Sequence, residues 1–241
     1  TYLASTSNSK AYTVGKGGLV VGCKNSIIPT DANIVTTIAR NSFYGCTGLT
    51  EITIPSNITQ ILPYAFGMCG FTSVTIESGW TFIGSYAFEY CNNLTEIIMP
   101  GSVTSIGNYA FHDCLGLTKV TIEKATEEGA ATTIGTYVFN GCTALAEVTL
   151  ADTVKSIGNY TFQNCTSLTS VTMKGVAQIP EGAFEGCAAL TNITVGDVTS
   201  IAKRAFYGCA SLTTITIPNT VTSIGTGAFY GCASLTTITI P

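Results

Sequence analysis

The chain repeats one pattern of apolar and polar positions along most of its length. Leu49, Ile52 and Ile54 show its first half, in which the last apolar positions alternate with polar ones. Alternation with a period of two predicts a short strand with one buried face. The second half returns apolar residues at irregular spacing, from Ile58 to Phe66, which predicts a wound turn or a short helical bend. Each unit is therefore expected to form one coil, and one coil cannot bury its own apolar face.

Two side chains mark the period of this unit. Cysteine recurs at nine equivalent positions, most of them 22 or 23 residues apart, at Cys46, Cys69, Cys91, Cys114, Cys142, Cys165, Cys187, Cys209 and Cys232. Phenylalanine recurs three positions before each cysteine, at Phe43, Phe66, Phe88, Phe111, Phe139, Phe162, Phe184, Phe206 and Phe229. A fixed period of this length predicts a solenoid of stacked coils, whose recurring strands form a parallel sheet.

The unit resembles the BspA-type, or treponemal-type, leucine-rich repeat. The resemblance rests on the Leu-x-x-Ile-x-Ile strand, the proline after it, the Ile-Gly-x-x-Ala-Phe turn and the cysteine three residues past phenylalanine. It covers nearly the whole chain. The resemblance implies an α/β, β-rich solenoid with coils of 22 to 23 residues, curved as a right-handed superhelix with the parallel sheet on its concave side. It also implies a family of surface or secreted adhesion proteins of host-associated microbes.

We expect the chain to form one continuous domain. Its parts are a hairpin-like N-terminal cap at 1–21, a degenerate first repeat at 22–43, eight leucine-rich repeats at 44–229 and an incomplete final repeat at 230–241. The last strand, which ends at Pro241, is not followed by a covering coil in this sequence. Either the native protein continues beyond it, or a molecule that is otherwise a monomer associates end to end through this coil.

Departures from the unit predict local changes in structure. Phe71 replaces the leucine and Trp80 stands in a valine column, so both are expected to be core substitutions. One copy gains five residues, and Glu123 to Ala130 are expected to protrude as a loop. The acidic pair Glu127 and Glu128 in this loop is a candidate partner contact, although solenoids also tolerate insertions as solvated surface loops.

Outward strand positions give the predicted concave face its chemistry. The candidate partner-binding residues are Glu51, Thr53, Ser73, Thr75, Glu96, Ile98, Lys119, Thr121, Glu147, Thr149, Ser170, Thr172, Asn192 and Thr194. They form two columns, of which one varies and the other is almost entirely threonine. Solenoids bind partners with such surfaces, but exposed strand positions also simply prefer threonine. Binding is therefore favoured for the variable column around Glu96, Ile98, Lys119 and Glu147.

A row of tyrosines two positions before phenylalanine is a second candidate surface. Its members are Tyr64, Tyr86, Tyr109, Tyr137 and Tyr160. We expect these rings to stack along one flank. Exposed aromatic rings can hold a sugar or a peptide, although a half-buried tyrosine needs no ligand. Because Gly182, Arg204 and Gly227 interrupt the row, a ligand-binding stripe would be confined to the first five copies.

The cysteine spacing disfavours disulfides. Equivalent atoms of stacked strands lie about 4.8 Å apart with parallel side chains, whereas a disulfide needs converging Cβ atoms about 3.8 Å apart. The cysteine column is therefore predicted to be reduced and buried, with weak S–H donors near backbone carbonyls. Metal binding and redox chemistry are the alternatives, and no Cys-x-x-Cys spacing favours them. Cys23 lies outside the column, in the position of the leucine.

Charge and motifs exclude several classes of function. The chain has 10 Lys and Arg against 14 Asp and Glu, a net charge of −4, so phosphate neutralisation cannot drive binding to nucleic acid. No run of apolar residues is long enough for a membrane-spanning helix, and the first residues show no signal-peptide pattern. The single histidine, His112, and the lack of nucleophile, P-loop or paired-carboxylate motifs predict no enzyme, no metal and no cofactor.

The sequence therefore predicts a non-enzymatic cell-surface or secreted adhesion protein. Its partner is expected to be a host protein, a glycoprotein, another cell or a glycan, held on the concave face. The location is implied by the family resemblance. The alternative is a rigid structural spacer that displays another domain.

Overall fold

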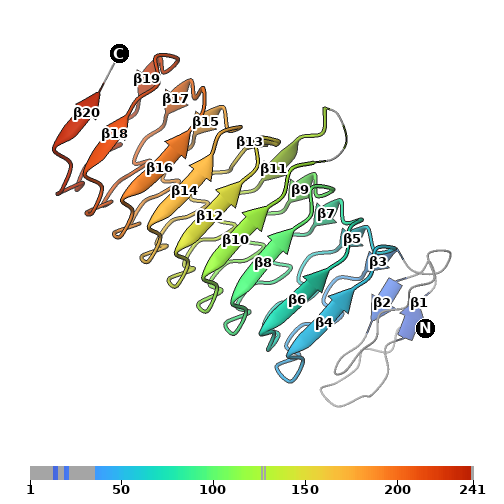
Figure 1. Cartoon of the computed structure of the whole chain (residues 1–241). Helices are drawn as coiled ribbons and strands as arrows, with labels where there is room; N and C mark the ends of the chain where they lie inside the picture. Colours follow the sequence, from blue (N-terminus) through green and yellow to red (C-terminus); the bar gives the residue numbers. More distant parts are fainter. Residues whose placement is uncertain (1–12, 16–18, 22–35, 126, 128, 240–241) are drawn as a thin grey trace.

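The computed structural model describes residues 13–15, 19–21, 36–125, 127 and 129–239. These residues form an elongated stack of coils built from strands and turns (Figure 1). The stacked solenoid expected from the repeat is confirmed. No helix occurs among the described residues, and hence none that is long and apolar enough to cross a membrane.

Each coil places its longer strand in one row, which we call the broad face. The strands of this row are β4 (Glu51–Ile54), β6 (Ser73–Ile76), β8 (Glu96–Met99), β10 (Lys119–Ile122), β12 (Glu147–Leu150), β14 (Ser170–Met173), β16 (Asn192–Val195), β18 (Thr214–Thr216) and β20 (Thr237–Thr239). Paired neighbours are parallel and in register, so equivalent residues of successive coils lie side by side.

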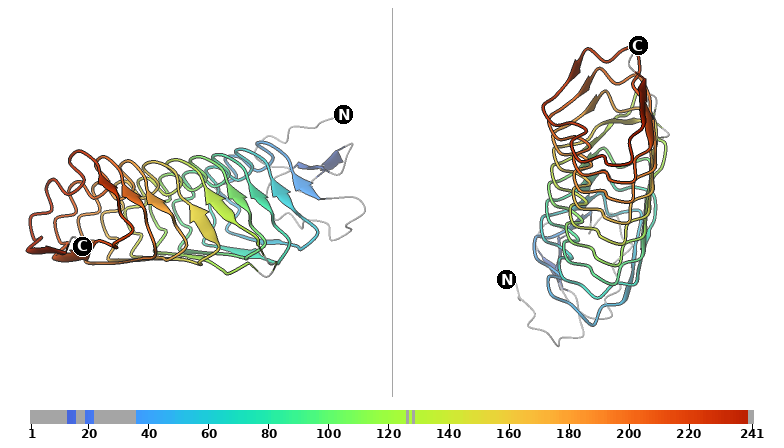
Figure 2. Two further views of the ribbon diagram at one scale, coloured as in Figure 1. Left: turned by 90° about the horizontal axis from the view of Figure 1, so that it is seen from above. Right: turned by 90° about the vertical axis from the view of Figure 1, so that its left-hand side faces the viewer.

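The shorter strands form a second row, which we call the narrow face. Its strands are β3 (Thr37–Ile38), β5 (Gln60–Ile61), β7 (Phe82–Ile83), β9 (Ser105–Ile106), β11 (Thr132–Ile134), β13 (Val154–Ser156), β15 (Gln178–Ile179), β17 (Ser200–Ile201) and β19 (Ser223–Ile224). Figure 2 shows the two rows on different sides of the coil stack. The apolar core lies between them.

An antiparallel hairpin precedes the first described coil. It consists of β1 (Thr13–Gly15) and β2 (Leu19–Val21), and β2 pairs in parallel with β3. The hairpin thus extends the sheet of the narrow face. Most of the expected cap at 1–21 and of the degenerate repeat at 22–43 lies outside the described residues, so these boundaries stay predictions.

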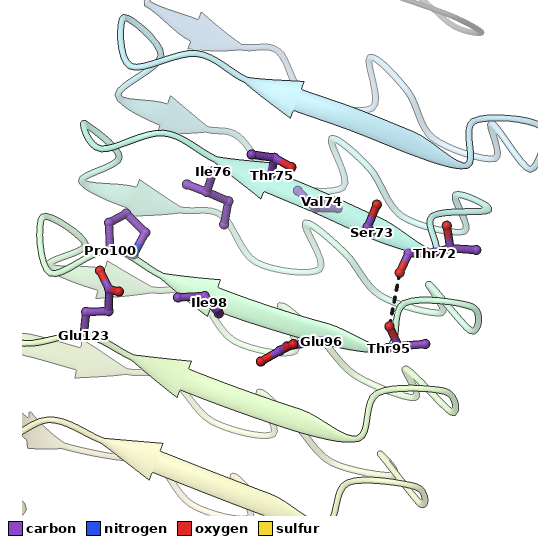
Figure 3. Close-up of a pocket in the computed structure, with 10 residues that line it drawn as sticks. All are labelled: Thr72, Ser73, Val74, Thr75, Ile76, Thr95, Glu96, Ile98, Pro100 and Glu123. Atoms are coloured by element: carbon purple, nitrogen blue, oxygen red, sulfur yellow. Dashed lines mark hydrogen bonds between the residues drawn. The ribbon is translucent and has the colours of Figure 1, made fainter.

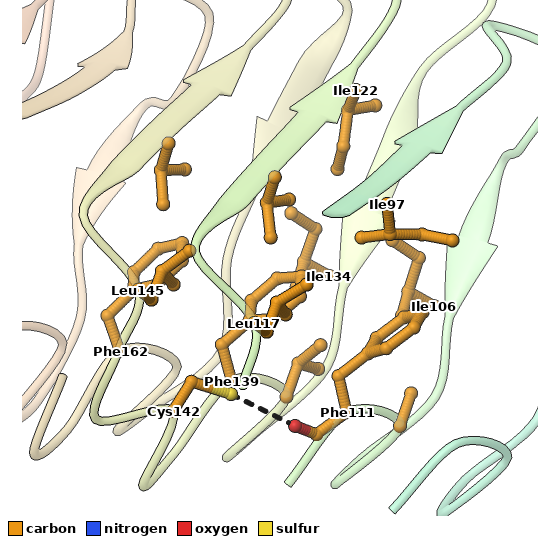
Figure 4. Packing of buried hydrophobic residues seen from close by; sticks show 14 of the residues in the cluster. Ile97, Ile106, Phe111, Leu117, Ile122, Ile134, Phe139, Cys142, Leu145 and Phe162 are labelled. Atoms are coloured by element: carbon orange, nitrogen blue, oxygen red, sulfur yellow. Dashed lines mark hydrogen bonds between the residues drawn. The ribbon is translucent and has the colours of Figure 1, made fainter. Parts of the chain in front are cut away.

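The phenylalanine column forms a continuous stack along the centre of the solenoid. Its members from Phe43 to Phe206 are completely buried, and Phe229 is partly buried. Successive ring centroids lie 5.0 to 5.5 Å apart. Figure 4 shows Phe111, Phe139 and Phe162 side by side in this stack. The coils are therefore joined through their core as well as through their backbones.

The turn around each phenylalanine contains two left-handed residues. One lies two positions before phenylalanine, where Tyr64 and Tyr86 have φ angles of 60° and 59°, and one lies two positions after it, where Tyr90 has a φ angle of 55°. The same two positions have positive φ in every coil from Asn41 to Gly231. A right-handed helix cannot continue through such residues. The returning segment is consequently a turn and not the short helical bend that the sequence left open.

Threonine hydroxyls at the start of the strands bind successive coils together. Thr104 donates both its N–H and its hydroxyl to the carbonyl of Thr81, at 3.0 and 2.9 Å. Thr118 does the same to the carbonyl of Thr95, at 2.8 and 2.9 Å. The abundant threonine is thus partly structural, because it satisfies carbonyl groups at the joints between coils.

Both core substitutions and the inserted loop are confirmed. Phe71 and Trp80 are completely buried, and both rings pack against Phe88. The insertion runs between β10 and β11 and projects beyond the neighbouring coils in Figure 1. Its base is held by an ion pair of 3.8 Å between Lys124 and Asp152. Of the acidic pair in this loop, Glu128 lies outside the described residues, so its role as a partner contact stays a prediction.

Three steps in the described stack lack strand pairing, although at one of them Ala177 still donates its backbone N–H to the carbonyl of Lys155 at 3.3 Å. On the broad face β6 does not pair with β8, nor β16 with β18, and on the narrow face β13 does not pair with β15. In each case the coil after the gap has a proline just past its strand. Pro100 and Pro180 directly follow β8 and β15, and Pro218 follows β18 after one residue. At intact steps a backbone N–H occupies this place, as where Glu123 donates to the carbonyl of Met99 at 2.9 Å. Since proline has no N–H, each break coincides with a missing donor.

We expect replacement of Phe139 by alanine to destabilise the fold by about 3 to 5 kcal/mol, because it removes a fully buried ring from the middle of the stack. Urea denaturation followed by circular dichroism measures this loss. The matched control is Phe229→Ala, whose ring is only partly buried and which should cost less. If both variants lost the same free energy of unfolding, burial of the ring would not determine its contribution to stability.

A second expectation concerns the break between β6 and β8. In a Pro100→Ala variant the new amide at position 100 should donate to the carbonyl of Ile76 and join the two strands. Amide hydrogen exchange should then show this amide as protected as that of Glu123, its counterpart one coil later. Exchange at the rate of an exposed loop amide would show that the missing N–H does not cause the break.

Candidate partner-binding face

The broad face carries the two predicted columns side by side. Pairing places Glu51 beside Ser73, Glu147 beside Ser170, and Ser170 beside Asn192. The threonine column is aligned in the same way, and Thr149 lies between its counterparts in β10 and β14. The structure therefore brings the predicted residues together as an ordered surface, interrupted only at the breaks between strands.

Charges on this face concentrate around β8, β10 and β12. Lys119 of β10 lies directly opposite Glu96 of β8 and Glu147 of β12. Both carboxylates are on exposed residues, whereas Lys119 is half-buried. Cross-strand neighbours of opposite charge attract one another. The accessible charge of this region is therefore dominated by its two glutamates.

A pocket of about 410 Å³ opens on the broad face at the break between β6 and β8 (Figure 3). Val74 and Ile76 of β6 line it and are only half-buried, while Ile97 and Met99, their counterparts in β8, are buried. Ile98 stands in the threonine column, lines the pocket and is 48% exposed. The break thus exposes apolar side chains that an intact sheet covers.

Polar groups line the same pocket. Thr95 donates its hydroxyl to the carbonyl of Thr72 at 3.3 Å, drawn as a dashed line in Figure 3. Glu96 lies beside Thr95, whereas Glu123 stands next to Pro100 at the opposite end of the pocket. Sequence reasoning singled out Glu96 and Ile98 but missed the pocket. A proline directly after a strand was the signal that could have indicated it.

The predicted tyrosine stack is present. From Tyr64 to Tyr160, successive ring centroids lie 4.7 to 4.9 Å apart with interplanar angles of 2° to 10°. These tyrosines occupy the left-handed turn position, which costs about 1 to 2 kcal/mol for an ordinary residue. Ring stacking contributes about 0.5 to 1.5 kcal/mol per pair. The two effects are of similar size, so the strain does not require a ligand to explain it.

Both ends of the tyrosine row are covered. Tyr44 packs edge to face on Tyr64 at 6.3 Å, and the ring of Tyr160 lies against Gly182, where a Cβ atom would come within 2.3 Å of it. A hydrogen bond of 2.8 Å to Glu181 raises the pKa of Tyr160 to about 12. The row therefore offers ring edges and hydroxyl groups, whereas a sugar stacks on free ring faces. Its role as a secondary binding stripe stays a prediction.

The cysteine column lies at the inner side of the turns. From Cys69 to Cys232, each thiol donates to the carbonyl of the phenylalanine in the preceding coil at 3.0 to 3.2 Å. Figure 4 shows one of these bonds, from Cys142 to Phe111. The same carbonyl accepts the backbone N–H of its own coil's cysteine, as from Cys114 at 3.4 Å. Each thiol therefore supplies a second partner to a buried carbonyl group.

The prediction of a fully reduced column is wrong for Cys46, which is disulfide-bonded. The other eight members, from Cys69 to Cys232, are free thiols. The partner of Cys46 is thus not a neighbour in the column, and the spacing argument does not apply to it. Burial raises the pKa of the Cys91 thiol to about 12, and it also raises the pKa of the Cys187 thiol. Cys91 and Cys187 are consequently poor nucleophiles and metal ligands at neutral pH.

Few side chains in the described part of the chain could bind a metal ion or take part in catalysis. No cluster of three or more His, Cys, Asp and Glu side chains there could hold a metal ion. His112 contacts Asp113, with Nδ1 3.3 Å from the carboxylate, and packs on Tyr90 and Tyr109. This surface histidine has aromatic and acidic neighbours but no nucleophile in the contacts that surround it.

Comparison with known proteins assigns the repeats. The family model described as "BspA type Leucine rich repeat region (6 copies)" matches residues 22–130 and 131–241. No curated protein sequence matches the chain significantly.

Solved structures of bacterial leucine-rich repeat proteins resemble this chain. A leucine-rich repeat protein of T. pallidum is 25% identical with a TM-score of 0.56, over 93% of this chain and 86% of that one. A leucine-rich cell surface protein of Faecalibacterium prausnitzii A2-165 is 26% identical with a TM-score of 0.46, over 91% and 79% of the two chains. The pneumococcal vaccine antigen PcpA is 18% identical with a TM-score of 0.49, over 94% and 78%.

The buried thiols predict a loss of stability at alkaline pH. The ordinary pKa of a cysteine thiol is 9.0 and that of folded Cys91 is about 12, so above pH 9 the unfolded chain loses a proton that the folded chain keeps. The free energy of unfolding should therefore fall by about 1.4 kcal/mol per pH unit for Cys91 alone between pH 9 and pH 12. Urea midpoints measured from pH 7 to pH 11 test this.

The control for this measurement is Cys91→Ser. Serine keeps a hydroxyl donor for the carbonyl of Phe66 but does not titrate in this range. The variant should therefore lose stability less steeply with pH than the unmodified chain. Identical slopes would mean that burial of this thiol does not hold its proton.

Proposed function

The chain belongs to the BspA-type leucine-rich repeat family, and we propose that it is a non-enzymatic cell-surface or secreted protein that binds other proteins, glycoproteins or cells through its broad face. Residues that hold the coils together repeat with little change, as the phenylalanine and cysteine columns show. The outward column that contains Glu96, Lys119 and Glu147 varies from coil to coil on the same ordered sheet. This variable column on an otherwise repetitive scaffold is the observation that supports binding.

The disulfide at Cys46 supports the proposed location. Disulfides form and persist mainly in secreted and surface proteins, where the surroundings are oxidising. The eight free thiols fit the same compartment, because seven of them are buried and the eighth is only partly exposed. Oxidation between them would also require side chains in parallel orientation to converge.

The second candidate is a rigid structural spacer. It is favoured by the unbroken phenylalanine stack and by the thiol bond at each joint from Cys69 onward. Both features resist bending and need no ligand. A spacer, however, gains nothing from an exposed Ile98 or from a pocket between β6 and β8.

A binding screen against extracellular-matrix proteins and a glycan panel distinguishes the two candidates. The purified chain is compared with a Glu96→Lys, Glu147→Lys variant, in which Lys119 would be flanked by two further positive charges. A partner held by the broad face should bind the variant at least tenfold more weakly, because charges directly across an interface set both orientation and encounter rate. Biolayer interferometry measures the affinities.

The matched control is Asp152→Lys, Asp197→Lys, which changes the net charge equally but alters turns outside the two columns. Its binding should be that of the unmodified chain. A partner that binds all three proteins equally would move the binding surface away from the broad face. If no ligand of either panel binds the folded chain, the spacer is the better description.

A further inference from the structure

The break between β6 and β8 leaves backbone acceptors without their usual donors. At intact steps, Ala151 donates to the carbonyl of Ile122 at 3.1 Å and Thr118 to that of Thr95 at 2.8 Å. No backbone hydrogen bond joins β6 to β8, and Pro100, which has no N–H, occupies the position from which Glu123 donates to the carbonyl of Met99 one coil later. Strand edges with free acceptors are the groups that an added extended peptide uses.

Apolar side chains surround these acceptors. Val74 and Ile76 are half-buried at the break, and Ile98 is exposed beside them. The volume of about 410 Å³ lies within the range of about 300 to 1,000 Å³ that is usual for ligand pockets. A branched apolar side chain is the group that such a site accommodates.

The charge of the pocket selects among apolar ligands. Glu96 and Glu123 line it, and no Lys or Arg does. Lys119 lies on the far side of β8, opposite Glu96, and leaves Glu123 without a cross-strand cation. A cationic group next to the apolar side chain therefore complements the site, and a chain with a net charge of −4 attracts such a group from a distance.

We propose that this break is a docking site for an extended peptide segment of a protein partner, in which a branched apolar residue stands next to a lysine or arginine. The apolar side chain enters the pocket between Val74, Ile76 and Ile98. A backbone N–H of the segment donates to the carbonyl of Ile76, and its cation binds the carboxylate of Glu123, next to Pro100. This inference rests on the proposed function, since it assigns one contact of the protein partner on the broad face.

To test this proposal, peptides that bind the intact chain are selected from a random heptapeptide display library. Recovered sequences should be enriched in Val, Ile or Leu adjacent to Lys or Arg. The best peptides, labelled with a fluorophore, are then titrated with the protein and followed by fluorescence anisotropy. Absence of enrichment, or enrichment without this apolar and basic pair, would overturn the proposal.

Three variants locate the binding site. Ile98→Thr gives β8 the residue that its neighbours have at this position, Glu123→Gln removes one carboxylate, and Pro100→Ala supplies the donor that closes the break. Each should weaken peptide binding at least tenfold. Ile98 and Glu123 are exposed, so these two substitutions should leave the melting temperature unchanged and keep the test valid if Pro100→Ala perturbs folding.

Matched controls make the same kinds of change away from the break and outside the proposed partner-binding residues. Thr239→Ile places an isoleucine in the threonine column where β18 and β20 pair, and Asp197→Asn removes an exposed carboxylate from a bend. Both should bind the peptides as the unmodified chain does. Equal effects in Ile98→Thr and Thr239→Ile would refute a site at the break.

The outcomes also separate this inference from the proposed function. A partner from the matrix or glycan screen that is lost in the charge-reversed double variant but unaffected by Ile98→Thr and Pro100→Ala keeps the proposed function and overturns the pocket. Peptides that depend on the pocket, together with a screen that yields no partner, support the pocket and count against the ligand classes proposed above.

Discussion

A single coil of this protein cannot satisfy its own backbone, because its strands have no partner within the coil and must pair with the coils before and after. Buried N–H and C=O groups that remain unpaired cost about 1 to 3 kcal/mol each. This need for partners explains why cysteine and threonine recur at fixed positions of the repeat. The thiol of Cys91 gives the carbonyl of Phe66 a second donor, and the hydroxyl of Thr104 does the same for Thr81. The same residue type therefore recurs from coil to coil where a carbonyl group between two coils needs a donor.

The places where the sheets are interrupted coincide with missing donors. Each of the three breaks in the described stack precedes a coil in which proline follows the strand. Phe stacking and thiol bonds continue across the break between β6 and β8, as between Phe66 and Phe88 and from Cys91 to Phe66. A missing donor can therefore open the broad face locally without separating the coils. The scaffold tolerates an exposed strand edge because its other joints carry the stacking.

Much of this architecture could be predicted from sequence, and the remainder depends on relations between coils. Column positions identified the phenylalanine stack, the tyrosine row and the burial of Trp80, since each follows from one repeat placed on the next. The disulfide at Cys46 escaped the spacing argument because its partner lies outside the column. The pocket was not predicted because a proline after a strand indicates only a turn within its own coil. The donor that Pro100 lacks would serve the carbonyl of Ile76, which belongs to the preceding coil. Hydrogen-bond partners in different coils can be identified only when the register between the strands is known. The sequence alone does not give that register.

The two breaks on the broad face are not equivalent, and the difference argues that only one is suited to binding. Both leave the inward side chains of the preceding strand half-buried, Val74 and Ile76 in β6 and Ile193 and Val195 in β16. The outward residues of β18 are threonines, so β18 itself adds neither an exposed apolar side chain nor a carboxylate to that break. At β8 the threonine is replaced by Ile98 and the rim carries glutamates. The missing donor creates an opening in both places, but only at β8 do the surrounding side chains give the opening a chemical preference.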